Sequence, residues 1–468
     1  QIDTWESFVT NLRLQLERLA PQGGRGLRIL TETVVSPTLA DQLRQLLEKY
    51  PNAEWHQYEP VNRDNALLGS RLAFGADVEP LYHLEQADVI LSLDADFLVD
   101  GPMHLKNARG FALRRKVDPA RGAASMNRLY VVETSPTLTG AAADHRLATG
   151  PAEVANVALA VAAALGLDAS GSASSNVPAK WLEAVVGDLQ QARGRSLVIP
   201  GRNQPPAIHA LAHWINATLG NVGQTVEHLP PAAARAEVCA DSLRSLVNAM
   251  YAGDVQVLAI LGGNPVYDAP AEMKFAAALA RVPQRYRLGV YVDETSAACE
   301  WHINEAHLLE SWGDTRAADG TTSLVQPMIK PLYAGKTVIE FTAALAGNAA
   351  PNGHELVQAY WMKNLPAGAG DNFTTFWQTS LHDGVVAGTR ATAVTPNVNT
   401  GAVVEALAAL PSSSAPLQLV FRPDPSVWDG RYANNGWMQE LPRPFSKITW
   451  DNAALVSPQL ANDRGLKS

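Results

Sequence analysis

The residues best suited to hold a ligand form a glycine-rich turn in the middle of the chain. Five apolar residues, VLAIL, run directly into Gly262, Gly263, Asn264 and Pro265. Glycine and asparagine tolerate positive φ and proline cannot continue a hydrogen-bonded ladder, so the pattern predicts a buried strand that ends in a sharp turn. Such turns bind ligands in open α/β sheets, and their backbone N–H groups could face a diphosphate. The alternative is that these residues only permit the turn.

The elements that must position this turn alternate along the chain. Apolar runs typical of strands alternate with helical patterns, which indicates a largely parallel sheet covered by helices. Strands are expected within 26–33, 87–102 and 128–135. Ser36 is expected to cap the helix that follows the first of them, with Pro37 at the first helical position.

The strand segments recur later in the chain in the same order. Any two α/β units share such patterns, but three matches in order at a near-constant spacing predict an internal duplication. The expected fold is therefore α/β, with two duplicated, doubly wound, Rossmann-like lobes at 1–180 and 181–350. A cleft between the lobes would suit a ligand with two similar halves. The matches are Arg28-Ile29-Leu30 with Leu197-Val198-Ile199, 87–102 with 255–270, and Arg128-Leu129 and Glu133-Thr134-Ser135 with Arg287-Leu288 and Glu294-Thr295-Ser296.

The character of the sequence changes in its last part, 351–468. This part is expected to hold a linker, a helix and an incomplete C-terminal β segment. LQLVFRPD, at 417–424, is expected to be a strand. The segment from 417 onward should pack on the second lobe and leave apolar side chains uncovered.

Composition and charge exclude several classes of protein. The chain has 468 residues, is 47% apolar and carries a net charge of -9 at pH 7. It has no basic run that could follow a phosphate backbone, which argues against nucleic acid as a partner. No apolar run approaches the length of about eighteen residues that marks a bilayer span, so no direct membrane insertion is expected. Cys239 and Cys299 alone cannot supply a cysteine-ligated iron–sulfur cluster or a four-cysteine zinc site.

Several motifs resemble one enzyme family. GGNP at 262–265, VDETSAACEWHINEAHLLESWGD at 292–314 and DGTTSLVQPMIKPLY at 319–333 resemble the middle of the molybdopterin oxidoreductases of the dimethyl sulfoxide reductase and formate dehydrogenase type. The stretch 131–162 resembles that family's other nucleotide-facing lobe, and 434–466 resembles the start of its C-terminal barrel. The resemblance covers nearly the whole chain and implies the two-lobed fold.

Three stretches are closer still to one branch of that family. The stretches 294–336, 381–389 and 421–444 resemble the molybdopterin-like, iron–sulfur subunit of bacterial alternative complex III, a quinol:electron acceptor oxidoreductase. This resemblance implies a place at the periplasmic face of the bacterial inner membrane, among other subunits of a membrane-associated respiratory complex. In that branch the polypeptide continues into a ferredoxin-like domain that carries iron–sulfur clusters.

The family resemblance also implies where a cofactor would bind. In the catalytic relatives each lobe binds one guanine dinucleotide of a bis-pterin cofactor, and a side chain early in the first lobe often ligates the metal. The corresponding region here, 55–75, has no cysteine. It places Asn62 or Arg63 at the ligand position, where a guanidinium offers only donors, with Asp64 and Ser70 nearby. Vestigial cofactor contacts are expected at Gly262, Gly263, Asn264, Glu294, Thr295 and Thr134.

The counterpart of the glycine-rich turn argues against a bound cofactor. In the aligned segment it carries Asp94 and Asp96, and two carboxylates would repel a phosphate. The expectation is a scaffold domain of an oxidoreductase, with no catalytic residue, no metal site and no molybdenum cofactor of its own. The alternative is a fragment of a genuine molybdopterin guanine dinucleotide-dependent oxidoreductase.

A zinc site is a weaker candidate. Cys299, His302 and His307 lie close in sequence to three glutamates. Their spacing is not that of a helical His–Glu motif, and the segment fits the loop and strand pattern of the family. The glutamates are Glu300, Glu305 and Glu310.

Overall fold

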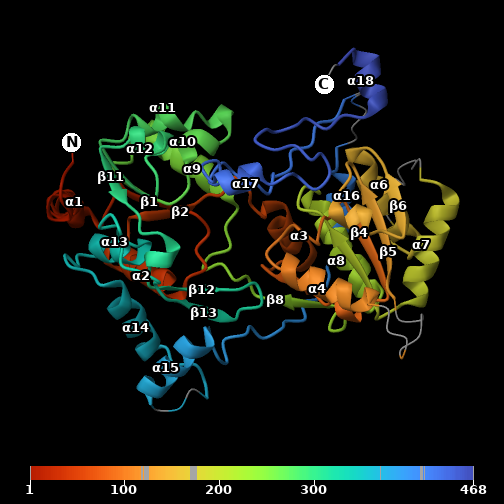
Figure 1. Ribbon diagram of the computed structural model, residues 1–468, viewed down its shortest axis with the longest axis horizontal. Helices are drawn as coiled ribbons and strands as arrows, with labels where there is room; N and C mark the ends of the chain where they lie inside the picture. Colours follow the sequence, from red (N-terminus) through yellow and green to blue (C-terminus); the bar gives the residue numbers. More distant parts are fainter. Residues whose placement is uncertain are drawn as a thin grey trace. The chain divides into compact units, whose positions relative to one another are not determined.

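The computed structural model describes residues 2–116, 120, 126–168, 177–368, 370, 372–411, 415 and 417–466 (Figure 1). The chain forms two compact units, and each is assembled from two separate stretches of sequence. Unit 1 comprises Gln1–Asp64 and Leu229–Ala393, and unit 2 comprises Asn65–His228 and Val394–Ser468. The predicted continuous lobes at 1–180 and 181–350 are therefore wrong as boundaries.

Unit 1 is built on a five-stranded parallel sheet. Its strands lie in the order β11–β10–β9–β1–β2, with the bounds Trp301–Asn304, Gln284–Gly289, Val257–Leu261, Leu27–Thr31 and Glu54–Gln57. β1 pairs with β9 from Leu27 opposite Val257 to Thr31 opposite Leu261. Every residue of both strands is buried, as is usual for strands inside a parallel sheet. An amino-terminal strand thus finds its partner in the later part of the chain, which a continuous first lobe could not provide.

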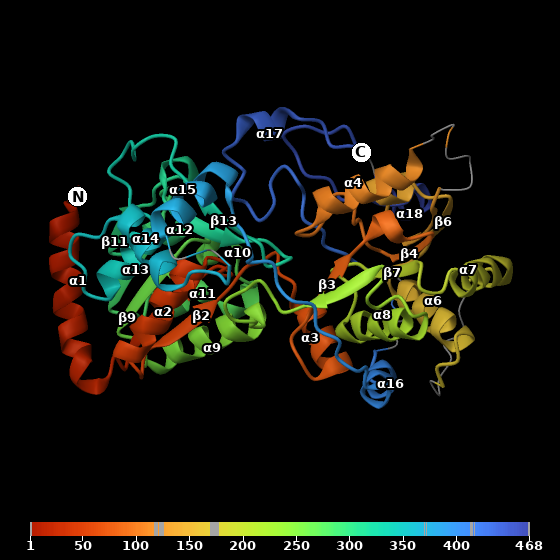
Figure 2. The same cartoon turned by 90° about the horizontal axis from the view of Figure 1, so that it is seen from below.

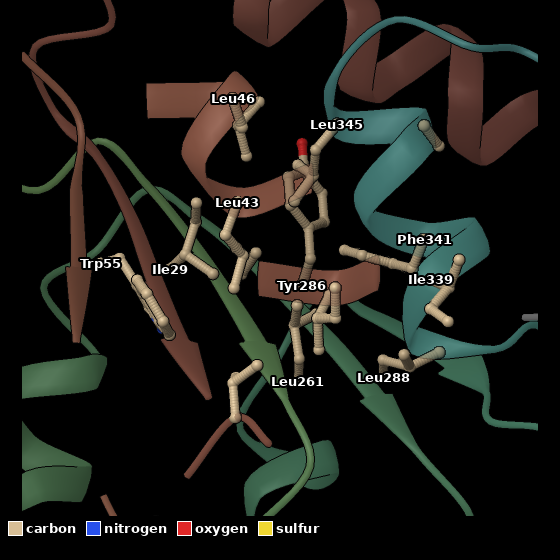
Figure 3. Packing of buried hydrophobic residues seen from close by; sticks show 14 of the residues in the cluster. Ile29, Leu43, Leu46, Trp55, Leu261, Tyr286, Leu288, Ile339, Phe341 and Leu345 are labelled. Carbon is tan, nitrogen blue, oxygen red and sulfur yellow. The ribbon is translucent and has the colours of Figure 1, made fainter. Parts of the chain in front are cut away.

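Helices cover both faces of this sheet. One face packs against α1, α2, α13 and α14, which span Trp5–Leu19, Pro37–Lys49, Val338–Leu345 and Gly353–Lys363. Leu43, Tyr286 and Phe341 meet at the centre of this layer (Figure 3). The opposite face packs against α9 and α11, which span Cys239–Ala252 and Phe275–Leu279. Alternate residues of β9 face the two layers, with Ala259 in one and Leu258 in the other, as strand geometry requires.

A buried carboxylate ties α2 to a small antiparallel sheet in unit 1. This sheet joins β12, β13 and β14, which span Gly313–Arg316, Thr322–Val325 and Val385–Val386. Asp314 of β12 is 5% exposed and accepts hydrogen bonds from Ser36 Oγ (2.5 Å), Thr38 N (3.2 Å), Thr38 Oγ1 (2.6 Å) and Trp361 Nε1 (3.0 Å). Ser36 also caps α2 by accepting from Leu39 N (3.1 Å), which confirms the predicted helix start.

Short helices complete unit 1. α10 and α12 follow the strands β9 and β10, and α15 follows α14 along the chain. These helices are α10 (Pro265–Asp268), α12 (Glu294–Ala297) and α15 (Phe373–Asp383). The 3₁₀ turns of the unit are η1 (Ala20–Gln22), η4 (Ala271–Met273) and η5 (Leu308–Glu310).

Unit 2 contains a second parallel sheet. Its four strands lie in the order β6–β5–β4–β7, with the bounds His145–Ala148, Arg128–Glu133, Val89–Leu93 and Ser196–Pro200. A separate pair joins β3 (Glu79–Tyr82) and β8 (Val226–Leu229). Both units are thus α/β with parallel sheets, which confirms the α/β class that the sequence predicts.

The helices of unit 2 lie on both faces of its sheet. On one face, Val157, Leu189 and Ile215 pack in one cluster with Leu91 of β4. On the other face, Phe111 packs in one cluster with Ile90 of the same strand. α8 and α16 lie side by side (Figure 2). The helical elements of unit 2 are α3 (Asp64–Phe74), η2 (Leu84–Gln86), α4 (His104–Arg115), α5 (Leu138–Ala141), α6 (Pro151–Ala164), α7 (Ala179–Gln191), α8 (Pro206–Thr218), α16 (Thr400–Ala408), α17 (Gly436–Glu440) and α18 (Pro458–Arg464). Among the described residues of the whole chain, no helix has the length and apolar character needed to span a bilayer.

The expected C-terminal β segment is not formed. Between 417 and 466 the described backbone contains one isolated bridge, between Asp424 and Trp428, and no strand. The apolar side chains of Leu417, Leu419 and Phe421 are 60%, 76% and 80% exposed, because no neighbouring strand lies beside them to pair with or to cover them. The prediction of uncovered apolar side chains is confirmed, and the prediction of a strand at 417–424 is wrong.

The same segment does not pack on the predicted second lobe alone. Gln418 accepts from Ala152 N (3.1 Å), and the carbonyl of Phe421 accepts from Asn203 Nδ2 (2.9 Å). Ala152 falls within the predicted first lobe and Asn203 within the predicted second. The segment therefore belongs to unit 2, which contains parts of both.

Unit 2 buries a pair of histidines. His213 Nδ1 on α8 and His228 Nε2 on β8 lie 3.3 Å apart, and the ring centroid of Phe74 lies 4.8 Å and 4.9 Å from theirs. Burial lowers the pKa of His228 to about 4. Burial is the main cause that lowers the pKa of His213 well below its ordinary range, and the neighbouring His228 lowers it further. Both rings are therefore neutral at pH 7, and charging either one opposes folding.

Acid is expected to destabilise unit 2 through this pair. Because the folded-state pKa values are depressed, the stabilising contribution is present above the ordinary value of 6.5 and is lost as the pH falls toward 4. The loss for His228 is on the order of 3 kcal/mol. Denaturant titrations from about pH 7 to about pH 4 should show it, and His228→Leu should flatten the pH dependence. The exposed His382 supplies the control variant His382→Leu, and equal pH dependence in all three proteins would contradict the prediction.

Candidate functional site

The glycine-rich turn of unit 1 lies directly after β9, as predicted. Gly262 and Gly263 have φ angles of 78° and 68°, so the turn requires residues that tolerate left-handed backbone. Gly262 N donates to Leu288 O of β10 (3.2 Å). Asn264 Oδ1 accepts from Thr295 N (3.2 Å) and Thr295 Oγ1 (2.7 Å), and Asn264 Nδ2 donates to Glu294 Oε2 (2.7 Å). The structure thus brings five of the six predicted cofactor contacts together, but their polar side chains bond to one another.

A carboxylate that the sequence did not single out lies beside this turn. Glu32 follows β1, which is the sheet neighbour of β9. A Cβ added to Gly262 would lie 2.8 Å from Glu32 Oε2. A phosphate bound to the backbone of the turn would therefore meet a carboxylate at close range, where like charges repel.

The strand ends next to the turn carry a buried guanidinium and a second carboxyl group. Arg287 is 3% exposed, and its guanidinium donates to Gly263 O, to Leu288 O and to Asp293 Oδ2 (2.9 Å). Glu305 directly follows β11. Burial raises the pKa of Glu305 to about 7, with the Arg287 charge opposing the shift and the Glu32 carboxylate adding to it. This edge of the sheet therefore holds a carboxyl group that changes charge near neutral pH.

Replacing Glu305 with glutamine is expected to reduce the pH dependence of unit 1 stability. A raised folded-state pKa gives a stabilising contribution that is complete below the ordinary value of 4.5 and is lost as the pH rises through about 7. The parent chain should lose on the order of 2 kcal/mol between about pH 5 and pH 8 that Glu305→Gln retains. Denaturant titrations across this range test the prediction, with the exposed Glu355→Gln as control. If Glu305→Gln follows the parent curve, Glu305 does not titrate near neutrality.

The corresponding turn of unit 2 carries Asp94 in place of Gly262. Asp94 has a φ of 59°, and its N–H donates to Val132 O of β5 (2.7 Å). Its carboxylate accepts from Thr134 N (3.0 Å) and pairs with Arg422 Nη2 (2.5 Å). The Asp94 side chain is 2% exposed. This carboxylate therefore does not stand open to repel a phosphate, because the chain itself neutralises and covers it.

The second predicted carboxylate of this turn is also bonded internally. Asp96 Oδ1 accepts from Thr139 N (2.9 Å) and from Thr139 Oγ1 (2.7 Å). Thr295 makes the same two bonds to Asn264 in unit 1. The residue that corresponds to Thr295 is therefore Thr139, and the predicted equivalence of Thr134 with Thr295 is wrong.

Glycine and carboxylate exchange places between the two turns. Gly201 follows β7 at the register position where Glu32 follows β1, since Pro200 lies opposite Leu93 and Thr31 opposite Leu261. A Cβ on Gly201 would lie 2.1 Å from Asp94 O. Unit 1 thus combines Glu32 with a glycine on the neighbouring strand end, and unit 2 combines a glycine with Asp94.

The region that corresponds to the metal-ligand position of the relatives is used for local structure. Asn62 Nδ2 donates to Glu59 O (3.1 Å), and Asn62 Oδ1 accepts from Asp64 N (3.2 Å). The Asp64 carboxylate accepts from Cys239 N (2.9 Å) and Ala240 N (3.1 Å) at the start of α9. Ser70 is buried in α3, where its hydroxyl donates to Leu67 O (2.9 Å). Asn62 and Asp64 are therefore committed to backbone groups.

The zinc candidate residues are dispersed. Glu300 pairs with Arg285, and His302 Nδ1 lies 3.0 Å from Ser296 Oγ. His307 and Glu310 cap the short helix η5. Across the described stretches of the chain, no three His, Cys, Asp or Glu side chains are grouped so that they could hold a metal ion.

Unit 1 also contains an open cleft of about 780 Å³ that the sequence did not indicate. Trp312 and His354 form part of its wall, and the first turns of α13 and α14 contribute Glu340 and Gly353. Its other side is formed by a loop that includes Met328. The volume lies within the range of about 300–1,000 Å³ that is common for ligand pockets.

Comparisons with known proteins show a likeness of fold. No protein-family model and no curated protein matches the sequence. Acetylene hydratase from Pelobacter acetylenicus is similar in structure, with a TM-score of 0.53 and 12% identity, over 74% of this chain and 58% of that chain. The chain thus spans less than two thirds of that enzyme's length. At this identity the comparison shows the fold alone.

A second solved structure overlaps a similar share of the chain. The formyltransferase/hydrolase complex from Methylorubrum extorquens, in complex with methylofuran, matches with a TM-score of 0.48 and 13% identity, over 74% of this chain and 96% of that chain.

Proposed function

We propose that this chain is a molybdopterin-oxidoreductase-like domain that acts as a scaffold in a subunit of a respiratory quinol:electron acceptor oxidoreductase and holds no molybdenum cofactor. The sequence motifs at 292–314 and 319–333 support the family. The likeness in fold to acetylene hydratase, an enzyme of the molybdopterin family, agrees with it.

The observation that carries the scaffold role is that the chain's own groups fill both candidate phosphate positions. In unit 1 the Glu32 carboxylate lies beside the glycine turn. In unit 2 the Asp94 carboxylate accepts a hydrogen bond from Thr134 N and forms an ion pair with Arg422. An anionic dinucleotide would have to displace these contacts or approach Glu32, and either costs free energy. The residues present therefore do not fit a guanine dinucleotide at either turn.

We also propose that the two units arose by internal duplication. Strand order supports it, since β6–β5–β4–β7 in unit 2 parallels β11–β10–β9–β1 in unit 1. Register supports it as well: Ile90 lies opposite Leu197, and Leu258 lies opposite Arg28. Both pairs agree with the sequence alignment. For the next strand the register instead matches Arg128-Leu129 to Gln284-Arg285, a correction of the predicted match to Arg287-Leu288.

In this role the domain would position neighbouring subunits at the periplasmic face of the bacterial inner membrane. Electrons would pass through iron–sulfur clusters outside this chain. These placements rest on the resemblance of 294–336 and 421–444 to the subunit of alternative complex III.

Elemental analysis and calorimetry together test the proposal. The purified chain is expected to contain no stoichiometric molybdenum or tungsten, and titration with guanosine diphosphate should give no saturable heat. Glu32→Gln removes the repelling charge at the turn and serves as a sensitised variant. Saturable micromolar binding to the parent chain that is lost in Gly263→Asp would overturn the proposal. It would support the alternative, a fragment of a genuine molybdopterin guanine dinucleotide-dependent oxidoreductase.

A further inference from the structure

The cleft of about 780 Å³ in unit 1 has an aromatic wall that is held in place by stacking. The ring centroids of Trp312 and His354 lie 4.5 Å apart, and those of Trp312 and Trp377 lie 6.3 Å apart at an interplanar angle of 27°. Phe373 stacks on Trp377 at 6.0 Å. Trp312 and His354 thus line the cleft with aromatic side chains that are held by packing, and aromatic rings attract cations.

Two carboxylates of the cleft are oriented by backbone N–H groups. Glu310 accepts from His307 N and Leu332 N, both at 3.1 Å. Glu340 accepts from Thr337 N (2.9 Å) and Gly353 N (3.3 Å). These bonds hold both groups as fixed anionic acceptors, whereas the one cationic side chain in the lining, Lys330, is exposed. The cleft therefore has a surplus of negative charge beside an aromatic face.

The loop that forms one side of the cleft, and the residues that follow it, carry exposed apolar side chains. Met328 and Ile329 are 78% and 50% exposed, and Leu332 and Tyr333 are 69% and 79% exposed. The loop that carries them is anchored by bonds from Met328 N to Leu309 O (2.7 Å) and from Asn304 Nδ2 to Tyr333 O (3.4 Å). Large exposed apolar side chains next to a cleft mark a surface for binding.

We propose that this cleft binds an extended segment of a partner protein in which an arginine is flanked by apolar residues. The guanidinium would lie against Trp312 and donate to the carboxylates of Glu310 and Glu340, which suits its planar fork of donors. The apolar neighbours in the segment would cover the exposed rim at Met328 and Ile329. This inference goes beyond the scaffold role and does not depend on whether unit 1 or unit 2 binds a nucleotide.

The test uses the full chain and a fluorescent peptide. The probe is Leu-Pro-Arg-Pro-Leu with blocked ends, and binding is followed by fluorescence anisotropy. Matched peptides carry glutamine or glutamate in place of the arginine. We expect saturable binding of the arginine peptide, and binding on the order of tenfold weaker or less for the matched peptides, because a charge-assisted bidentate contact is lost.

Variants of the chain locate the binding site. The double variant Glu310→Gln and Glu340→Gln should weaken arginine-peptide binding at least about tenfold, while Glu355→Gln, on α14 but outside the cleft lining, should leave it unchanged. Lys330→Glu changes an exposed side chain and should strengthen binding several-fold, even if the double variant does not fold. Equal binding of the arginine and glutamine peptides, no saturable binding of the arginine peptide, or unchanged binding in Lys330→Glu would each overturn the proposal.

Discussion

Replacing Gly201 with alanine is expected to destabilise unit 2 by about 3 kcal/mol. The added Cβ would lie 2.1 Å from Asp94 O and 2.6 Å from Asp94 C, and these backbone atoms follow β4 directly. Gly201 N also donates to Leu93 O (2.9 Å), so the two strand ends cannot separate without losing this bond. Native-state hydrogen exchange in β4 and β7 measures the change within unit 2.

Gly187 provides the control for this substitution. It lies inside α7 of the same unit, and a Cβ there would meet nothing within 4 Å. Gly187→Ala should leave stability unchanged or raise it by about 0.5–1 kcal/mol, because alanine favours helix more than glycine does. If Gly201→Ala is as stable as Gly187→Ala, the strand ends are not packed as closely as the structure shows.

The second large effect is expected at Asp314 in unit 1. Asp314→Ala removes a buried carboxylate that accepts four hydrogen bonds from Ser36, Thr38 and Trp361, and leaves these donors without an acceptor. Because unsatisfied buried donors each carry a desolvation cost, the expected loss is about 4 kcal/mol. Denaturant titration followed by hydrogen exchange in α2 and β12 would measure it.

Asp314→Asn separates the charge from the hydrogen bonds. The asparagine keeps one carbonyl oxygen at similar size, so it should lose less stability than Asp314→Ala, with the remainder due to the lost charge and acceptor. A loss below about 1 kcal/mol in Asp314→Ala would show that water or rearrangement satisfies the three donor residues.

Local signals in the sequence predicted the elements that depend on near neighbours. Ser36 and Pro37 marked the start of α2, and the run VLAIL marked β9 with its glycine turn. Capping and left-handed turns involve residues a few positions apart, so residue type alone specifies them.

Strand pairing could not be predicted from the same signals. β1 and β9 are buried on both faces, and an apolar parallel strand accepts many partners equally well. The place of Glu32 beside Gly262 follows only once β1 is known to lie next to β9. The carboxylate of Glu32 could therefore not be placed at the turn from the sequence alone.

Two further errors have the same origin. The triplet Glu-Thr-Ser suggested that Thr134 corresponds to Thr295, whereas hydrogen bonding across the strand ends identifies Thr139. The apolar pattern at 417–424 predicted a strand, but a strand also needs a neighbour for its backbone bonds, and none lies beside it among the residues that the structure describes. Both features depend on contacts distant in sequence.

The pairing of β1 with β9 also determines the order in which the chain can fold during synthesis. β1 and β2 leave the ribosome before the rest of their sheet, and β9, the later parallel partner of β1, follows only after β3 to β8 have been made. The sheet β6–β5–β4–β7 can form while the amino-terminal strands still expose apolar faces and unpaired edges. Nascent chains would therefore need a chaperone to protect residues 27–57. A stalled chain that ends near residue 250 would be prone to aggregate through β1 and β2.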